Sequence, residues 1–225
     1  TRWATHGRPS EENAHPHRAG DVVLIHNGII ENYVELREQL RKQGREIQSE
    51  TDTEVAAHLL ELQVASGEDL TTAMQRVCQM LEGAFTLVAV DAEDPDRVVA
   101  ARRNSPLVVG VGEGENFLGS DVAAFIEHTR EALELGQDQV VTITRDGVSV
   151  TDFSGREVEA KAYHVDWDLS AADELLVDAR CAIFGDWQTG NWLGTDGKGR
   201  DLLSRIIWGS RMSILVALAA TLCSL

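Results

Sequence analysis

Two hydrophobic periods divide this 225-residue chain into a run of helices followed by a run of strands, and that division constrains the fold most. Apolar residues recur at helical spacing in segments 31–43, 52–66 and 70–81, and Gly44 and Gly67 end the first two. Short apolar or alternating runs then replace the helical period. Amphipathic helices beside strands that are apolar on both faces predict sheets covered by helices, which is an α+β or α/β layered domain.

The expected strands are short and are separated by turn residues such as Asp-Pro, Ser-Pro and Gly. Asp146-Gly147 lies between two alternating runs and is the strongest hairpin signal in the sequence. The buried strand before the first helix ends at His26. We expect strands at 21–26, 84–90, 97–101, 107–111, 140–144 and 148–151.

The composition excludes one class of partner. Hydrophobic residues make up 43% of the chain, so a sizeable core can form, and the net charge is -17. A nucleic-acid surface needs clustered Lys and Arg to displace counterions from the phosphates, so no nucleic-acid partner is expected. Almost all of the acidic excess lies before residue 173, which suggests that the segment from 173 onward has a different origin.

Cysteines and histidines give no metal or disulfide pattern. Cys78, Cys181 and Cys223 are far apart and odd in number, whereas zinc ligands come in close pairs. His15 and His17 are two apart with no third ligand nearby, so no metal site is expected there.

Three short polar motifs carry the candidate chemistry. Asn27 and Gly28 follow the first strand directly, and an Asn side-chain amide and a Gly N–H can both donate to one developing negative oxygen. Asn-Gly is also a common turn. Asp52 is a candidate ligand for an ammonium group, although Thr51 or Asp52 can equally cap the helix that follows. Arg2 matches a carboxylate with its guanidinium fork, or is simply a solvated arginine near the terminus.

Four segments in order resemble one family: TRWATHG at 1–7, NAHPH at 13–17, HNGIIEN at 26–32 and SETDTE at 49–54. They resemble the glutaminase half of the glutamine–fructose-6-phosphate aminotransferases, and the resemblance runs over about residues 1–172. It implies the four-layer αββα sandwich of the N-terminal-nucleophile hydrolases, here incomplete. It also implies hydrolysis of glutamine to supply ammonia for glucosamine 6-phosphate synthesis, in the cytoplasm and without a cofactor.

The resemblance assigns a role to each candidate residue. Asn27 and Gly28 correspond to the oxyanion hole, and Asp52 corresponds to the carboxylate that receives the α-ammonium of glutamine. Arg2 corresponds to the residue that binds the α-carboxylate. Three neighbours complete the implied site: Thr5 and His6 as support for the same carboxylate, and Trp3 near the path that ammonia follows.

The nucleophile of this family is a cysteine at the N-terminus of the mature protein, upstream of the TRWATHG segment. Its own α-amino group is the expected proton acceptor. The sequence given begins at Thr1 and therefore lacks this cysteine, so we expect the chain to be inactive unless Thr1 takes over the attack. The sugar-isomerase domains of the family are also absent from the sequence given. The parent family implies a homo-oligomer.

The segment near the other end resembles a different family. GTDGKGRDLLSRIIWGSRMSILVALAAT at 194–221 resembles the permease subunit of peptide importers driven by ATP. The apolar run 212–225 is shorter than the roughly 20 residues that cross a bilayer, although 206–225 is a possible membrane contact. The expected division is a glutaminase domain at 1–172, a junction at 173–189 and a permease-like fragment at 190–225, with the start of an apolar helix.

Two alternatives to a glutaminase stay open. The chain is a membrane component if residues 190–225 define it, and a glutamine-binding module without catalysis if Arg2 and Asp52 only hold the amino acid. The joining of two partial families also suggests a truncated or chimeric reading frame.

Overall fold

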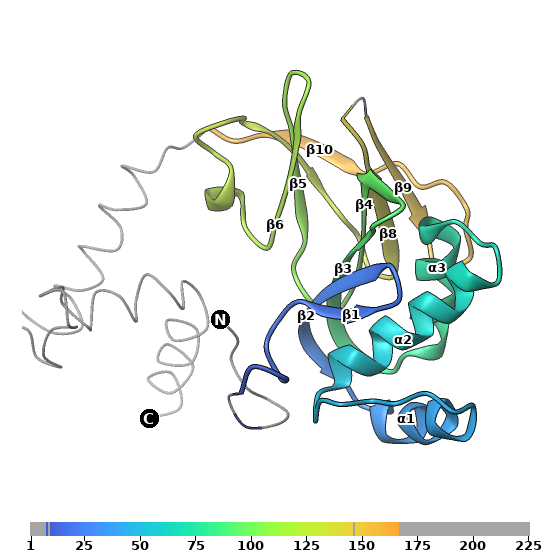
Figure 1. The fold of residues 1–225 in the computed structure, drawn as a ribbon. Helices are drawn as coiled ribbons and strands as arrows, with labels where there is room; N and C mark the ends of the chain where they lie inside the picture. Colours follow the sequence, from blue (N-terminus) through green and yellow to red (C-terminus); the bar gives the residue numbers. More distant parts are fainter. Residues whose placement is uncertain (1–7, 9, 146, 167–225) are drawn as a thin grey trace, which may run out of the picture. The chain divides into compact units, whose positions relative to one another are not determined.

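The computed structural model describes residue 8, residues 10–145 and residues 147–166, which all lie in one compact unit, Thr1–Leu169 (Figure 1). The expected C-terminal helical segment, the junction and the permease-like fragment lie outside the described residues, and the division of the chain into domains stays a prediction. No helix within the described ranges is long and apolar enough to cross a membrane.

Three helices and a large antiparallel sheet form the first half of the fold. The helices are α1 (Tyr33–Lys42), α2 (Asp52–Ala65) and α3 (Leu70–Met80), close to the segments that the helical period predicts. The six-stranded sheet has the order β1-β2-β3-β4-β8-β9. Its strands are β1 (His17–Ala19), β2 (Val22–Ile30), β3 (Gly83–Asp91), β4 (Asp94–Arg103), β8 (Gln139–Ile143) and β9 (Val148–Asp152).

A smaller antiparallel sheet forms the next layer and has the order β10-β7-β5-β6. Its strands are β5 (Val108–Val111), β6 (Asn116–Gly119), β7 (Glu131–Glu134) and β10 (Lys161–His164), and a 3₁₀ turn, η1 (Val122–Ala124), follows β6. Of these four strands, only β5 was expected. The others are four residues long and are only partly buried or carry exposed charges, so a hydrophobic pattern does not reveal them.

Strand alternation separates the apolar residues into layers. Side chains such as Leu24 and Leu87 pack against the helices, together with Met74 and Val77 of α3. The side chains that alternate with these along the strands face the other side of the large sheet. Ala100, Val141 and Ile143 pack there in a second cluster, together with Val109 and Leu135 from the side of the small sheet. The described residues therefore form helices, large sheet and small sheet in that order, which agrees with the predicted αββα class in its incomplete form (Figure 1).

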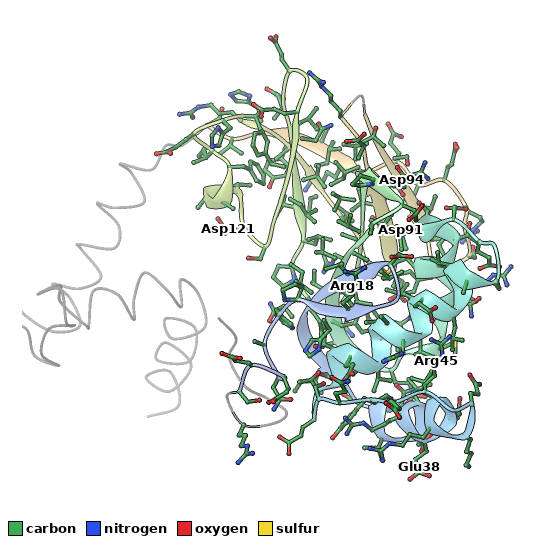
Figure 2. All side chains as sticks on the ribbon, in the orientation of Figure 1. Arg18, Glu38, Arg45, Asp91, Asp94 and Asp121 are labelled. Carbon is green, nitrogen blue, oxygen red and sulfur yellow. The ribbon has the colours of Figure 1, made fainter. Side chains whose placement is uncertain are left out.

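The charged side chains labelled in Figure 2 lie toward the outside of these layers. Asp94, at the start of β4, pairs with Arg97 at 2.9 Å, and Figure 2 shows Asp91 next to it across the β3–β4 turn. Arg45, just after α1, forms an ion pair of 2.5 Å with Glu61 of α2. This ion pair connects the end of one helix to the middle of the next and is partly shielded from solvent.

Candidate active site

Gly28 in β2 occupies a position that only glycine fits. Its φ is +128°, a conformation that L side chains rarely adopt. A Cβ atom there would lie 2.1 Å from the carbonyl oxygen of Ala84 and 2.8 Å from Cα of Phe85, both on the neighbouring strand β3. The neighbouring Asn27 is exposed and lies opposite Thr86. Asn-Gly therefore lies within a strand of the large sheet and does not form a turn.

One edge of β2 has no paired strand along its second half in the described part of the chain. The short strand β1 pairs only with Val22–Leu24, whereas β3 pairs with all of β2. The N–H of Ile30 donates to Oδ2 of Asp52 at 3.0 Å across this open edge. Because backbone groups alternate in direction along a strand, Gly28 shares the edge that Ile30 presents to Asp52.

Asp52 is fully buried at the first turn of α2. Thr51 is the helix cap, because its hydroxyl accepts the N–H of Glu54 at 3.3 Å. Of the two expected caps, Thr51 is therefore the actual one, and the Asp52 carboxylate bonds to another segment instead. Nδ1 of His26 lies 3.7 Å from its Oδ1, so both carboxylate oxygens face groups of β2. The structure thus places Asp52 next to the strand that carries Asn27 and Gly28.

Three histidines converge on the start of α2. Nδ1 of His26 lies 3.2 Å from the hydroxyl of Thr53, and Nε2 of His15 lies 3.4 Å from the same hydroxyl. His17 contacts the hydroxyl of Thr51 at 3.2 Å. The His-Pro-His segment therefore contributes hydrogen bonds to the helix start. No group of three or more His, Cys, Asp or Glu side chains within residues 10–145 and 147–166 has an arrangement that would hold a metal ion.

Glu54 fixes the loop that leads into α2. Its carboxylate accepts the N–H of Gln48 at 2.9 Å and that of Ser49 at 2.5 Å, and Nε2 of His58 lies 3.7 Å away. Burial opposes ionisation of Glu54, but these hydrogen bonds and the His58 side chain outweigh it and lower its pKa to about 2. Glu54 is therefore an ionised, buried carboxylate whose hydrogen-bond partners belong to the loop before α2.

Asn13 connects this loop to the segment before β1. Its amide donates to the carbonyl of Arg8 at 2.9 Å, and its oxygen accepts the N–H of Glu50 at 2.9 Å. Sequence reasoning assigned no role to Asn13, Ser49, Thr53 or Glu54, although all four are buried. The run of polar residues in SETDTE, at a helix start between apolar segments, is the sequence signal for Ser49, Thr53 and Glu54, whereas Asn13 opens the NAHPH segment.

Four sequence-predicted site residues, Arg2, Trp3, Thr5 and His6, lie outside the described residues, as does Thr1. The structure therefore brings together Asn27, Gly28 and Asp52 of the predicted set.

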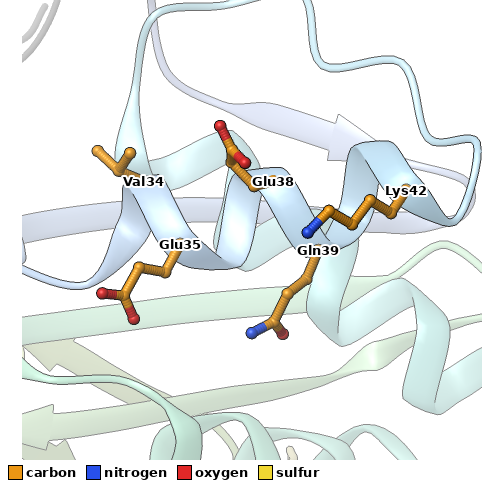
Figure 3. Close-up of a pocket in the computed structure, with 5 residues that line it drawn as sticks. All are labelled: Val34, Glu35, Glu38, Gln39 and Lys42. Atoms are coloured by element: carbon orange, nitrogen blue, oxygen red, sulfur yellow. The ribbon is translucent and has the colours of Figure 1, made fainter.

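Two other features lie apart from these residues. Cys78 of α3 is fully buried, and burial raises the pKa of its thiol, so a thiolate is disfavoured there. A hollow of about 280 Å³ lies on the outer face of α1 and is lined by Val34, Glu35, Glu38, Gln39 and Lys42 (Figure 3). None of the predicted site residues lines it.

Known proteins match both the sequence and the fold. Residues 4–127 match the family described as "Glutamine amidotransferase domain". The chain is 64% identical to the glutamine–fructose-6-phosphate aminotransferase (isomerizing) of Streptomyces coelicolor, over 77% of this chain and 29% of that protein. It is 58% identical to the enzyme of the same name from Corynebacterium diphtheriae, over 77% of this chain and 28% of the relative. The chain thus spans less than a third of these relatives' length.

A solved structure of lower identity agrees in fold. The glutamine phosphoribosylpyrophosphate amidotransferase of B. subtilis is 26% identical, with a TM-score of 0.57 over 69% of this chain and 34% of that one. The family match covers more than half of the chain, and the described Asn27, Gly28 and Asp52 lie within it. This chain belongs to the glutamine amidotransferase domain family.

Proposed function

We propose that this chain is the glutaminase part of an enzyme that aminates fructose 6-phosphate, and that L-glutamine is held at the open edge of β2 for the release of its ammonia. The observation that supports this most is the fully buried carboxylate of Asp52, bonded to Ile30 two residues along the strand from Gly28. A buried carboxylate is costly unless a cation or hydrogen bonds compensate it. The α-ammonium of glutamine is such a cation. The relatives' printed names supply the acceptor sugar.

The amino acid end of glutamine needs two charged partners. Asp52 receives the α-ammonium, and its Oδ2 also accepts the N–H of Ile30 at 3.0 Å. Arg2 binds the α-carboxylate in a bidentate manner, supported by Thr5 and His6. Trp3 lies on the path that ammonia takes. The roles of Arg2, Thr5, His6 and Trp3 stay predictions, because these residues lie outside the described part of the chain.

The amide end of glutamine needs an oxyanion hole. Attack on the amide carbon converts its carbonyl oxygen into an oxyanion, and donors placed in advance lower the barrier. The exposed amide of Asn27 and the N–H of Gly28 are adjacent in β2 and supply two such donors. Cys78 is excluded as the nucleophile by its full burial.

Expectations about the whole protein stay predictions as well. They comprise a homo-oligomer, a cytoplasmic location, possible membrane contact of residues 206–225 and the permease-like origin of residues 190–225.

Binding of glutamine to the purified chain tests the first half of the proposal. Calorimetry should show binding of L-glutamine to the wild type and a loss of about 10- to 100-fold in affinity for Asp52→Asn, because a hydrogen bond to a charged group contributes about 1.5–3 kcal/mol. Asn27→Ala should change affinity less than about twofold, since its partner oxyanion exists only during reaction. The absence of heat with glutamine would refute the proposal.

A chimera tests the second half. Residues 8–166 replace the corresponding segment of the Streptomyces coelicolor relative, and formation of glucosamine 6-phosphate from glutamine is measured. We expect glutamine-dependent product, and a fall in kcat of about 100- to 1,000-fold for Asn27→Ala. A chimera that binds glutamine but gives no product would leave a glutamine-binding module without catalysis as the better description.

A further inference from the structure

Asn13 joins two segments that are far apart in the sequence, the chain that leads toward β1 and the loop that leads into α2. Its side chain is buried. The amide of Asn13 donates to the carbonyl of Arg8 at 2.9 Å and to Oε2 of Glu50 at 3.2 Å, and its oxygen accepts the N–H of Glu50 at 2.9 Å. The same Oε2 of Glu50 accepts the N–H of Arg8 at 3.3 Å. These four hydrogen bonds among Arg8, Asn13 and Glu50 are called the Asn13 clamp below.

The loop on the Glu50 side of the clamp is itself anchored to α2. Glu54, in the first turn of α2, accepts the N–H of Ser49 at 2.5 Å. Glu50 follows Ser49 directly and precedes Asp52 by two residues. Buried polar networks whose members are all bonded hold their segments in one arrangement. The clamp therefore fixes the backbone at Arg8 relative to the loop that carries Asp52.

The Arg8 side of the clamp leads to the residue expected to bind the α-carboxylate of glutamine. Arg2 precedes Arg8 by six residues, and it precedes His17, where β1 begins, by fifteen. Six residues reach at most about 20 Å. The probability that a chain segment brings its end to a given point falls with about the 3/2 power of its length. Moving the nearest fixed point from Arg8 to His17 lowers that probability by up to about fourfold.

We propose that Asn13 and Glu50 are positioning residues for the α-carboxylate of glutamine: the clamp keeps the segment that carries Arg2 attached close to the loop that carries Asp52. The inference rests on the proposed function, in which Asp52 receives the α-ammonium and Arg2, outside the described residues, binds the α-carboxylate. Asp52 belongs to the loop that stays anchored when Arg8 is released. Loss of the clamp therefore weakens ligands that have an α-carboxylate and spares a ligand without one.

Two analogues of glutamine, each without one charged group, make the test specific. 4-Aminobutanamide lacks the α-carboxylate, and glutaramate lacks the α-amino group. Binding of all three ligands to the full 225-residue chain is followed by NMR titration, which also reports folding. Asn13→Ala should weaken glutamine and glutaramate by the same factor, about two- to fourfold, and leave the affinity for 4-aminobutanamide unchanged.

Glu50→Ala covers the case in which Asn13→Ala does not fold, because the side chain of Glu50 is exposed. It removes the two hydrogen bonds that Oε2 accepts and keeps the one from the backbone N–H to Asn13. Glutamine and glutaramate should therefore weaken about twofold. Asn116→Ala is the matched control, since it removes an amide that donates to the carbonyl of Thr144 at 2.9 Å, beside the small sheet. It should leave all three affinities unchanged.

Equal weakening of all three ligands by Asn13→Ala, or unchanged affinities in whichever clamp variants fold, would overturn the positioning role while the proposed function survives. If the wild type binds no glutamine, or binds 4-aminobutanamide as tightly as glutamine, the proposed function fails and the inference fails with it.

Discussion

Helices α2 and α3 pack on the same face of the large sheet, but they begin in different environments. At α3 the cap is Asp69, an exposed residue whose carboxylate accepts the N–H groups of Thr71 and Thr72 at 3.0 and 3.2 Å. At α2 the cap is Thr51, and every residue from Thr51 to Glu54 is buried. Both starts satisfy the unpaired N–H groups of the first turn. Only one of them does so at the cost of desolvating two carboxylates.

The difference in burial between the two helix starts shows that capping does not account for the buried carboxylates of α2. An exposed aspartate caps a helix well, so capping alone gives no reason to bury Asp52 and Glu54. Burial of a charged group is unfavourable unless hydrogen bonds compensate it. Glu54 is compensated by the loop it fixes, and Asp52 accepts the N–H of Ile30. The start of α2 therefore holds two buried carboxylates through contacts with other segments, whereas the cap of α3 accepts from its own first turn.

The largest expected effect on stability lies in α3. Met74 is fully buried against the large sheet. Met74→Ala should lower the free energy of unfolding by about 2–5 kcal/mol, because it removes apolar contacts and leaves a cavity. Urea unfolding measures the loss. The affinity for glutamine, measured by calorimetry, should not change in the folded fraction. A changed affinity would mean that α3 takes part in binding, and the comparison between the two helices would break down.

Glu54→Gln should give a smaller loss that depends on pH. The pKa of Glu54 is about 2 when folded, below the ordinary value of 4.5. The folded state therefore binds fewer protons, and the stabilisation is complete above about pH 4.5 and is lost as the pH falls toward 2. The shift corresponds to about 3 kcal/mol as an upper estimate at pH 7. Unfolding measured from pH 7 to 2.5 should show the difference between variant and wild type shrinking over that window.

Glu38→Gln is the matched control for this experiment, since it makes the same chemical change at an exposed glutamate on the outer face of α1. A difference between Glu54→Gln and wild type that stays constant from pH 7 to 2.5 would contradict the pKa assigned to Glu54.

The helices were predictable because each has an apolar stripe and a recognisable end. Gly44 and Gly67 follow α1 and α2 closely. The helix expected at 70–81 is α3, Leu70–Met80, in the structure. Strands β6, β7 and β10 were not predictable, because their order in the small sheet depends on pairing between distant segments. Glu131 of β7, for example, pairs with His164 of β10. Neither residue belongs to an apolar run.

The site was predictable only in part for a similar reason. Asn27, Gly28 and Asp52 follow from the motifs, but the link between Thr53 and His26 depends on how α2 packs against β2. The sequence predicts His26 only as the end of a buried strand. It is buried, but its ring also faces the carboxylate of Asp52. A contact that crosses from a strand to a helix leaves no periodic signal in the sequence.

The smallest expected effect belongs to the cap of α3. Asp69→Ala removes a carboxylate whose Oδ1 accepts two backbone N–H groups and whose Oδ2 accepts the hydroxyl of Thr72. It should lower the free energy of unfolding by about 1 kcal/mol. The first-turn N–H groups then turn to water, which is available because Asp69 is exposed. Glutamine affinity should remain within about twofold of wild type by calorimetry. A loss well above 2 kcal/mol, or a loss of binding, would show that the two helix starts are less independent than their contacts indicate.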